Sequence, residues 1–123
     1  MFGAFDFAEN GLAVVQVDEN GLFAYIDVTG EFVIEPKYSY AYDFNANGLA
    51  SVQDADSGLF GYIDATGEFV IEPMFYDAFK FAENGLAPVF DVKSGLLGYI
   101  DAKSKFVIEP MFYDGWVYIK VNK

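Results

Sequence analysis

Apolar and polar positions alternate over short stretches of the chain, separated by glycine, asparagine and aspartate. Near residues 12–17, small apolar side chains recur at every second position, the period of a strand with one buried face. A second strand is predicted near residues 23–27. A third is predicted at residues 32–34, where a continuous apolar run indicates burial on both faces. The pattern shows no long amphipathic helix and therefore predicts an all-β chain.

This pattern occurs three times. Residues 10–13, 25–27 and 32–36 each recur twice at an offset of 37 residues, and sixteen of the 37 positions are identical in all three copies. The repetition predicts an all-β fold of three tandem antiparallel β-meander repeats in an open, solenoid-like array. The alternative is closure into a pseudo-threefold, trefoil-like arrangement. We expect one repeat domain over residues 1–123, with units at about 7–43, 44–80 and 81–114, and with 115–123 as a partial fourth unit or a capping strand.

The connections between the strands follow known turn chemistry. Asp27–Gly30 has the composition of a type I turn followed by glycine in the left-handed region, and the Asp27 carboxylate can accept a backbone hydrogen bond. In the third copy Ser104 replaces the glycine, which makes that hairpin less favourable. Proline at position 36 and its equivalents is expected to end the third strand, because it has no N–H to donate. Three aromatic residues in the connectors are expected to fill the core between units: Phe7, Phe44 and Phe81.

The composition excludes several classes of function. The chain has 19 acidic residues, seven lysines, no arginine, no cysteine and no histidine, for a formal net charge of −12. Histidine-dependent triads and thiolate or histidine metal sites are therefore excluded. Phosphate backbones and anionic membrane surfaces would repel such a chain, so we expect neither a nucleic acid nor a membrane as its partner. The first residues lack the pattern of a secretory signal, which makes the cytoplasm the default location.

The carboxylates give no sign of catalysis or metal binding. The repeated aspartates and glutamates occupy equivalent positions, whereas acid–base catalysis needs two carboxylates in different environments. The segment Asp54–Gly58 starts like a calcium loop, but the other two copies do not preserve its oxygen ligands. No phosphate-binding glycine loop is present. We therefore expect no enzyme, and we assign no catalytic, cofactor-binding or metal-binding residue.

One string of residues resembles a known family. The segment Gly58–Pro73, continued through Phe75–Ala78 to Val89, is similar to the WG (Trp-Gly) repeat of bacterial proteins. The Trp-Gly pair of that family stands here as Phe23-Ala24, Phe60-Gly61 and Leu97-Gly98. The resemblance implies a β-rich repeat domain without assigned catalysis that is often described as an interaction module. It supplies no catalytic residues.

These observations favour a non-catalytic repeat module for protein–protein interaction. The partner is unknown, but residues 1–79 hold all but five of the acids and only one lysine, which favours a basic partner. The alternative is carbohydrate or cell-wall binding through exposed aromatic rings, because flat rings can stack on sugar faces. Most of the aromatic side chains are expected to fill the core. The candidate ligand surface is formed by Tyr40, Tyr76, Tyr113 and Trp116.

Overall fold

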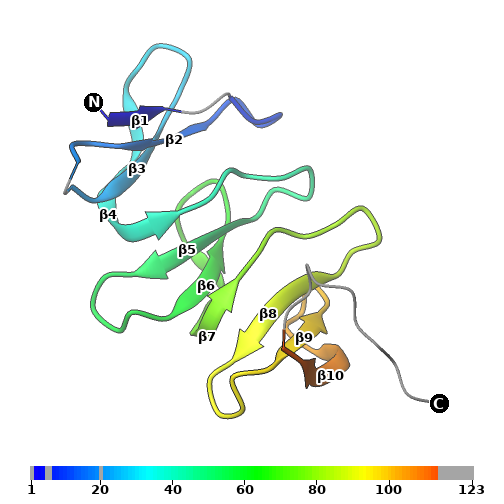
Figure 1. Ribbon diagram of the computed structural model, residues 1–123. Coiled ribbons are helices and arrows are strands. Elements are labelled where there is room, and N and C mark those ends of the chain that lie inside the picture. Colours follow the sequence, from blue (N-terminus) through cyan, green and yellow to red (C-terminus); the bar gives the residue numbers. More distant parts are fainter. Residues whose placement is uncertain (1, 5–6, 20, 114–123) are drawn as a thin grey trace.

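A computed structural model describes residues 2–4, 7–19 and 21–113, and every regular element in them is a strand (Figure 1). Ten strands form one sheet in chain order, each antiparallel to its neighbour. The all-β prediction is confirmed. The strands are β1 (Phe2–Ala4), β2 (Ala13–Gln16), β3 (Phe23–Ile26), β4 (Phe32–Ala41), β5 (Ala50–Asp54), β6 (Phe60–Ile63), β7 (Phe69–Ala78), β8 (Ala87–Asp91), β9 (Leu97–Ile100) and β10 (Phe106–Phe112).

The three repeats follow one another from the upper left to the lower right of Figure 1. Each contributes a hairpin of two short strands and then a longer strand: β2 to β4, β5 to β7 and β8 to β10. The sheet has β1 at one edge and β10 at the other, so the predicted open array is confirmed and the trefoil-like closure is not adopted. The predicted fourth unit or capping strand at 115–123 lies outside the described residues.

The long strands correct the prediction that proline ends the third strand. Both β4 and β7 are ten residues long and continue through Pro36 and Pro73. Pairing steps from Tyr25↔Ile34 to Phe23↔Tyr38, so an advance of two positions along β3 is matched by an advance of four along β4. Pro36 falls within this irregular stretch, where the ladder does not require an N–H. Beyond the proline the strand pairs with the next repeat, through Tyr38↔Asp54, and so connects neighbouring units.

Burial also differs from the prediction for residues 32–34. Ile34 is 3% exposed but Val33 is 46% exposed, so only one side of this strand faces the core. Burial on both faces occurs instead in the short hairpin strands, where Ala24 and Tyr25 of β3 are fully buried. Two-sided burial is therefore wrongly predicted for residues 32–34, and one-sided burial is wrongly predicted near residues 12–17, where Ala13, Val14 and Val15 are all buried.

Aromatic packing links each repeat to the one before it. The ring of Phe44 lies 4.8 Å from that of Tyr25, and the ring of Phe81 lies 5.0 Å from that of Tyr62. Both phenylalanines are buried, which confirms their predicted role. The same prediction is wrong for Phe7, which is 47% exposed. The physical reason is that the described residues place no tyrosine of a preceding unit against it.

The hairpin turns agree with their sequences. Gly30 and Gly67 have φ angles of +89° and +90°, and Ser104 occupies the same position with φ of +71°. The carboxylate of Asp27 accepts a hydrogen bond from the Thr29 amide at 2.9 Å. The turn prediction is therefore confirmed, and the third hairpin places a side chain in the left-handed region, which favours glycine.

Candidate functional site

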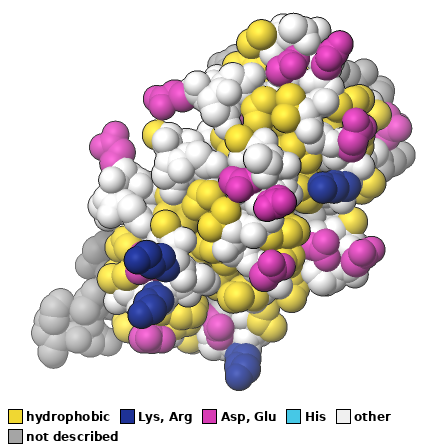
Figure 2. Space-filling view, turned by 180° about the vertical axis from the view of Figure 1, so that it is seen from behind, with side chains coloured by type: hydrophobic (Ala, Val, Ile, Leu, Met, Phe, Trp, Pro, Cys, Tyr) yellow, Lys and Arg dark blue, Asp and Glu magenta, His cyan; other side chains and the backbone are white. Residues whose placement is uncertain are grey.

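The clearest surface feature is a row of exposed side chains along each long strand. In β7 every second residue from Val70 to Tyr76 is exposed, while Ile71 and Phe75 between them point to the core. Figure 2, seen from behind, shows hydrophobic side chains reaching the surface across much of the molecule, with acidic side chains among them. We call the alternating exposed positions along the three long strands the outer row. Its members are Val33, Glu35, Lys37 and Ser39 in β4, Val70, Glu72, Met74 and Tyr76 in β7, and Val107, Glu109, Met111 and Tyr113 in and just after β10.

The structure separates the aromatic residues of the predicted ligand surface. Tyr76 and Tyr113 hold equivalent positions in the outer row and are 68% and 86% exposed. Tyr40 is 41% exposed and lies one position later in its repeat, where its ring contacts those of Phe23 and Tyr42 at centroid distances of 5.0 Å. Trp116 lies outside the described residues. Of the predicted residues, two therefore occupy equivalent exposed positions in neighbouring repeats.

The outer row also contains residues that the sequence reasoning did not select. Val70, Glu72 and Met74 stand on the same exposed side of β7 as Tyr76. The signal was present as alternation through residues 70–76. It was missed because the proline was expected to end the strand, and because residues 69–71, before Glu72 and the proline, are all apolar.

The positions of the Trp-Gly pair serve the core. Phe23 and Phe60 are each 7% exposed, and Leu97 is 1% exposed. The small residue that follows is required by a close approach of two backbones: a Cβ built on Gly61 would lie 2.5 Å from the Ile71 carbonyl oxygen of β7. These pairs therefore position the long strand over the hairpin and offer no ring to a ligand.

The repeated aspartates are held by their own turns. Hydrogen bonding from the Thr29 hydroxyl lowers the pKa of Asp27, and the Thr66 hydroxyl has the same effect on Asp64. In the third repeat the pKa of Asp101 is lowered chiefly by the hydrogen bond from the Lys105 amide. All three carboxylates are therefore stabilised as anions in equivalent turns, which is a structural role.

The loop that begins like a calcium site is also an ordinary turn. Asp54 accepts a hydrogen bond from the Ser57 amide at 2.9 Å, and its own carbonyl accepts one from the Gly58 amide at 2.9 Å. Within the described ranges, no three acidic side chains gather closely enough to hold a metal ion. The same part of the chain contains no helix with the length and apolar character needed to cross a membrane.

Two tyrosine hydroxyls hold the long strands to the hairpins. The Tyr25 hydroxyl donates to the Tyr42 carbonyl at 2.6 Å, and the Tyr62 hydroxyl donates to the Phe79 carbonyl. Burial raises the pKa of both hydroxyls, so they remain protonated donors. Each bond joins the hairpin of one repeat to the residue directly after its long strand, and therefore has a structural role.

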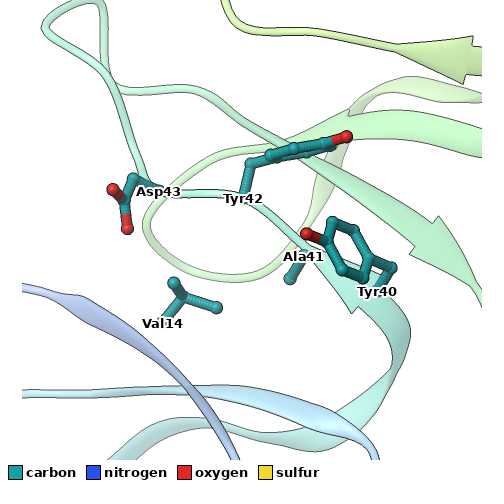
Figure 3. Close-up of a pocket in the computed structure, with 5 residues that line it drawn as sticks. All are labelled: Val14, Tyr40, Ala41, Tyr42 and Asp43. Carbon is teal, nitrogen blue, oxygen red and sulfur yellow. The ribbon is translucent and has the colours of Figure 1, made fainter. Parts of the chain in front are cut away.

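Hollows of different sizes occur on the surface, and two with volumes of about 430 and 550 Å³ lie between repeats. A smaller one of about 110 Å³ lies within the first repeat, between Val14 and the end of β4. Figure 3 shows the rings of Tyr40 and Tyr42 on one side of it and the carboxylate of Asp43 on the other. Burial raises the pKa of Tyr42 to about 12. Sites for small organic ligands usually have volumes of about 300–1,000 Å³, so this hollow is too small for such a ligand.

Comparison with known proteins gives one family. The model of the family described as WG containing repeat matches residues 23–56 and again residues 60–90, together more than half of the chain. No curated protein and no solved structure matches the chain. The two matched segments follow the same repeat that the hairpins and long strands show.

Proposed function

Because the chain belongs to the WG repeat family, we propose that it acts as a non-catalytic repeat module that binds a protein partner through its outer row. The observation that supports this proposal is the recurrence of one exposed set, valine, glutamate, methionine and tyrosine, in β7 and at β10. Val70 and Val107 are 51% and 57% exposed, and Met74 and Met111 are 46% and 56% exposed. Apolar side chains of this size at equivalent surface positions favour an interface.

The chemistry of the row favours a polypeptide with both apolar and cationic side chains. Tyrosine and methionine are enriched at protein interfaces, and methionine adapts to differently shaped partners. A glutamate stands between the valine and the methionine of each row, at Glu72 and Glu109. A partner that alternates apolar residues with lysine or arginine would contact both kinds of side chain. The net charge of −12 would speed its approach at low salt.

One observation supports carbohydrate binding as the second candidate. The rings of Tyr76 and Tyr113, the two aromatic side chains of the outer row, are 68% and 86% exposed. A ring with free faces can stack on a sugar. This candidate relies on the tyrosines alone, whereas the protein candidate also uses valine, methionine and glutamate.

The first repeat provides variants that separate the two candidates. It carries Lys37 and Ser39 where the second repeat has Met74 and Tyr76, so Met74→Lys and Tyr76→Ser place residues that the fold already accommodates. The probes are soluble glycans and synthetic peptides that alternate leucine or valine with lysine. Calorimetry measures the binding affinity of each probe. For the protein candidate we expect peptide binding that weakens about tenfold in each variant, which corresponds to about 1.4 kcal/mol of binding free energy.

Other outcomes decide the remaining alternatives. Glycan binding that is lost in Tyr76→Ser and kept in Met74→Lys would favour the carbohydrate candidate. Peptide binding should also weaken as salt rises, because it uses exposed carboxylates. Peptide binding that neither variant changes would reject the outer row as the site. An exposed substitution away from the row, Val28→Ser in the first hairpin turn, serves as the control, since Val28 is 74% exposed.

A further inference from the structure

Neighbouring repeats hold each other through two complementary groups of side chains. The first group, which we call the projecting set, reaches back to the repeat before it. In the second repeat this set is Phe44, Ile63 and Phe69, all of which pack into the core cluster of the first repeat. The ring of Phe69 lies 6.5 Å from that of Tyr38, in an edge-to-face contact. In the third repeat the projecting set is Phe81, Ile100 and Phe106, which pack into the core cluster of the second repeat in the same way.

The second group receives those side chains, and we call it the receiving set. In the first repeat it is Tyr25, Ile34 and Tyr38, which are 0–3% exposed. In the second repeat it is Tyr62, Ile71 and Phe75, which are also 0–3% exposed. The Phe75 ring receives Phe106 at a centroid distance of 6.4 Å, edge to face. The same interface is therefore formed twice within the chain.

Each end of the array carries one half of this interface. In the first repeat the projecting residues Phe7 and Phe32 are 47% and 44% exposed. In the third repeat the receiving residues Tyr99, Ile108 and Phe112 are only partly buried. Within the part of the chain that the structure describes, the projecting residues of the first repeat do not contact the receiving residues of the third. Figure 1 shows these two ends on opposite sides of the molecule.

The strands at the two ends are complementary as well. The long strands β4 and β7 have ten residues, whereas β10 has seven and β1 has three. By the 37-residue offset, β10 matches Phe69–Phe75 of β7 and β1 matches its last three residues, from Tyr76 to Ala78. Ala4 pairs with Val15 as Ala41 pairs with Val52, so β1 already holds the place of a second half-strand.

We propose that the chain binds a second copy of itself head to tail, with the receiving set of the third repeat of one copy covering the projecting set of the first repeat of the next. The junction repeats the interface that joins the units within the chain. Because the two surfaces differ, the contact is heterologous and leaves a free half at each end, so that assembly continues into short chains of molecules. This proposal is independent of the outer row.

The first experiment measures the mass of the 123-residue chain by sedimentation over a range of concentrations. We expect an average mass that rises with concentration beyond that of a dimer. Phe32→Glu should prevent this growth, because it places a charge in the apolar junction. Val33→Glu is the matched control: Val33 is adjacent and 46% exposed, against 44% for Phe32, but it belongs to the outer row. It should leave the mass distribution of the chain unchanged.

A mixing experiment tests the head-to-tail arrangement. Phe32→Glu keeps its receiving set, so in excess it should stop wild-type chains and reduce their average mass to that of a dimer. Val33→Glu should join the chains without shortening them. Thermal unfolding followed by circular dichroism verifies that both variants fold. A wild-type chain that stays monomeric at all concentrations, or chains that excess Phe32→Glu does not shorten, would overturn the proposal.

Discussion

The second and third repeats carry nearly the same core residues but bury them to different degrees. Tyr62, Ile71 and Phe75 of the second repeat are at most 3% exposed, and their equivalents in the third are only partly buried. The difference comes from the neighbour, because Phe81, Ile100 and Phe106 cover the second repeat. Each repeat therefore contributes one side of the interface with the preceding repeat and one side of the interface with the following repeat. The stability of the array depends on these contacts between nearest neighbours.

The largest expected difference between the two repeats is at the isoleucine of the long strand. Ile71→Ala removes a side chain that is 3% exposed and leaves a cavity, which should lower the free energy of unfolding by about 2–5 kcal/mol. At concentrations where the chain is monomeric, Ile108→Ala should cost clearly less, because Ile108 is only partly buried. Urea unfolding of both variants measures the difference. Equal losses would show that the third repeat is covered as completely as the second.

The next difference is expected at the glycine of the hairpin strand. A Cβ on Gly61 would lie 2.5 Å from the Ile71 carbonyl oxygen, and one on Gly98 would lie 2.8 Å from the Ile108 carbonyl oxygen. Gly61→Ala should therefore cost about 1–3 kcal/mol, the range for overpacking. Gly98→Ala should cost less, because in the described sheet β10 pairs only with β9 and can shift, whereas β7 is held by β6 and β8.

The first repeat provides the control for this pair. It carries Ala24 at the same position, fully buried, so the fold can accommodate a Cβ when the long strand is placed to suit it. Ala24→Gly should consequently bring no gain from relieved crowding. A stabilised Ala24→Gly variant in thermal unfolding would contradict this interpretation of the close approach.

The comparison also shows what the sequence could predict. The 37-residue period, the hairpins, their turns and the open array all follow from local patterns that recur. The course of the long strand did not, because the proline rule applies to a regular ladder and Pro36 lies where an advance of four positions along β4 matches two along β3. The exposed Phe7 was also predicted wrongly, since a repeated position indicates burial only where a neighbouring unit covers it.

The sequence selected candidate surface residues by their aromatic rings. Tyr76 and Tyr113 are exposed at equivalent positions of the outer row. Tyr40 was selected with them, but its place in the repeat is one residue later, against Phe23. The valines and methionines of the row were not told from core residues, because the alternation that marks them continues past a proline that was expected to end the strand.

A smaller difference is expected at the tyrosine hydroxyls. Tyr62→Phe removes the donor to the Phe79 carbonyl and should cost about 1 kcal/mol, the usual net value of one hydrogen bond. Tyr25→Phe should cost a similar amount, because its hydroxyl donates to the Tyr42 carbonyl at 2.6 Å. Tyr99→Phe should cost less, since Tyr99 is partly exposed and water can replace a lost partner. Chemical denaturation of the three variants tests this order.

The smallest effect is expected at the last turn residue of the second and third hairpins, which is Gly67 in one and Ser104 in the other. Ser104 has φ of +71°, a conformation that costs about 1–2 kcal/mol for a residue with a side chain, and Gly67 adopts +90° without that cost. Glycine loses more chain entropy on folding, so Ser104→Gly should stabilise the protein by only about 0.5–1 kcal/mol. Gly67→Ser should destabilise the protein, because serine would have to adopt the positive φ. Its Cβ would also lie 3.4 Å from Ile34. If the melting temperature of Ser104→Gly does not rise, the serine is stabilised by its surroundings, and the third hairpin is as favourable as the second.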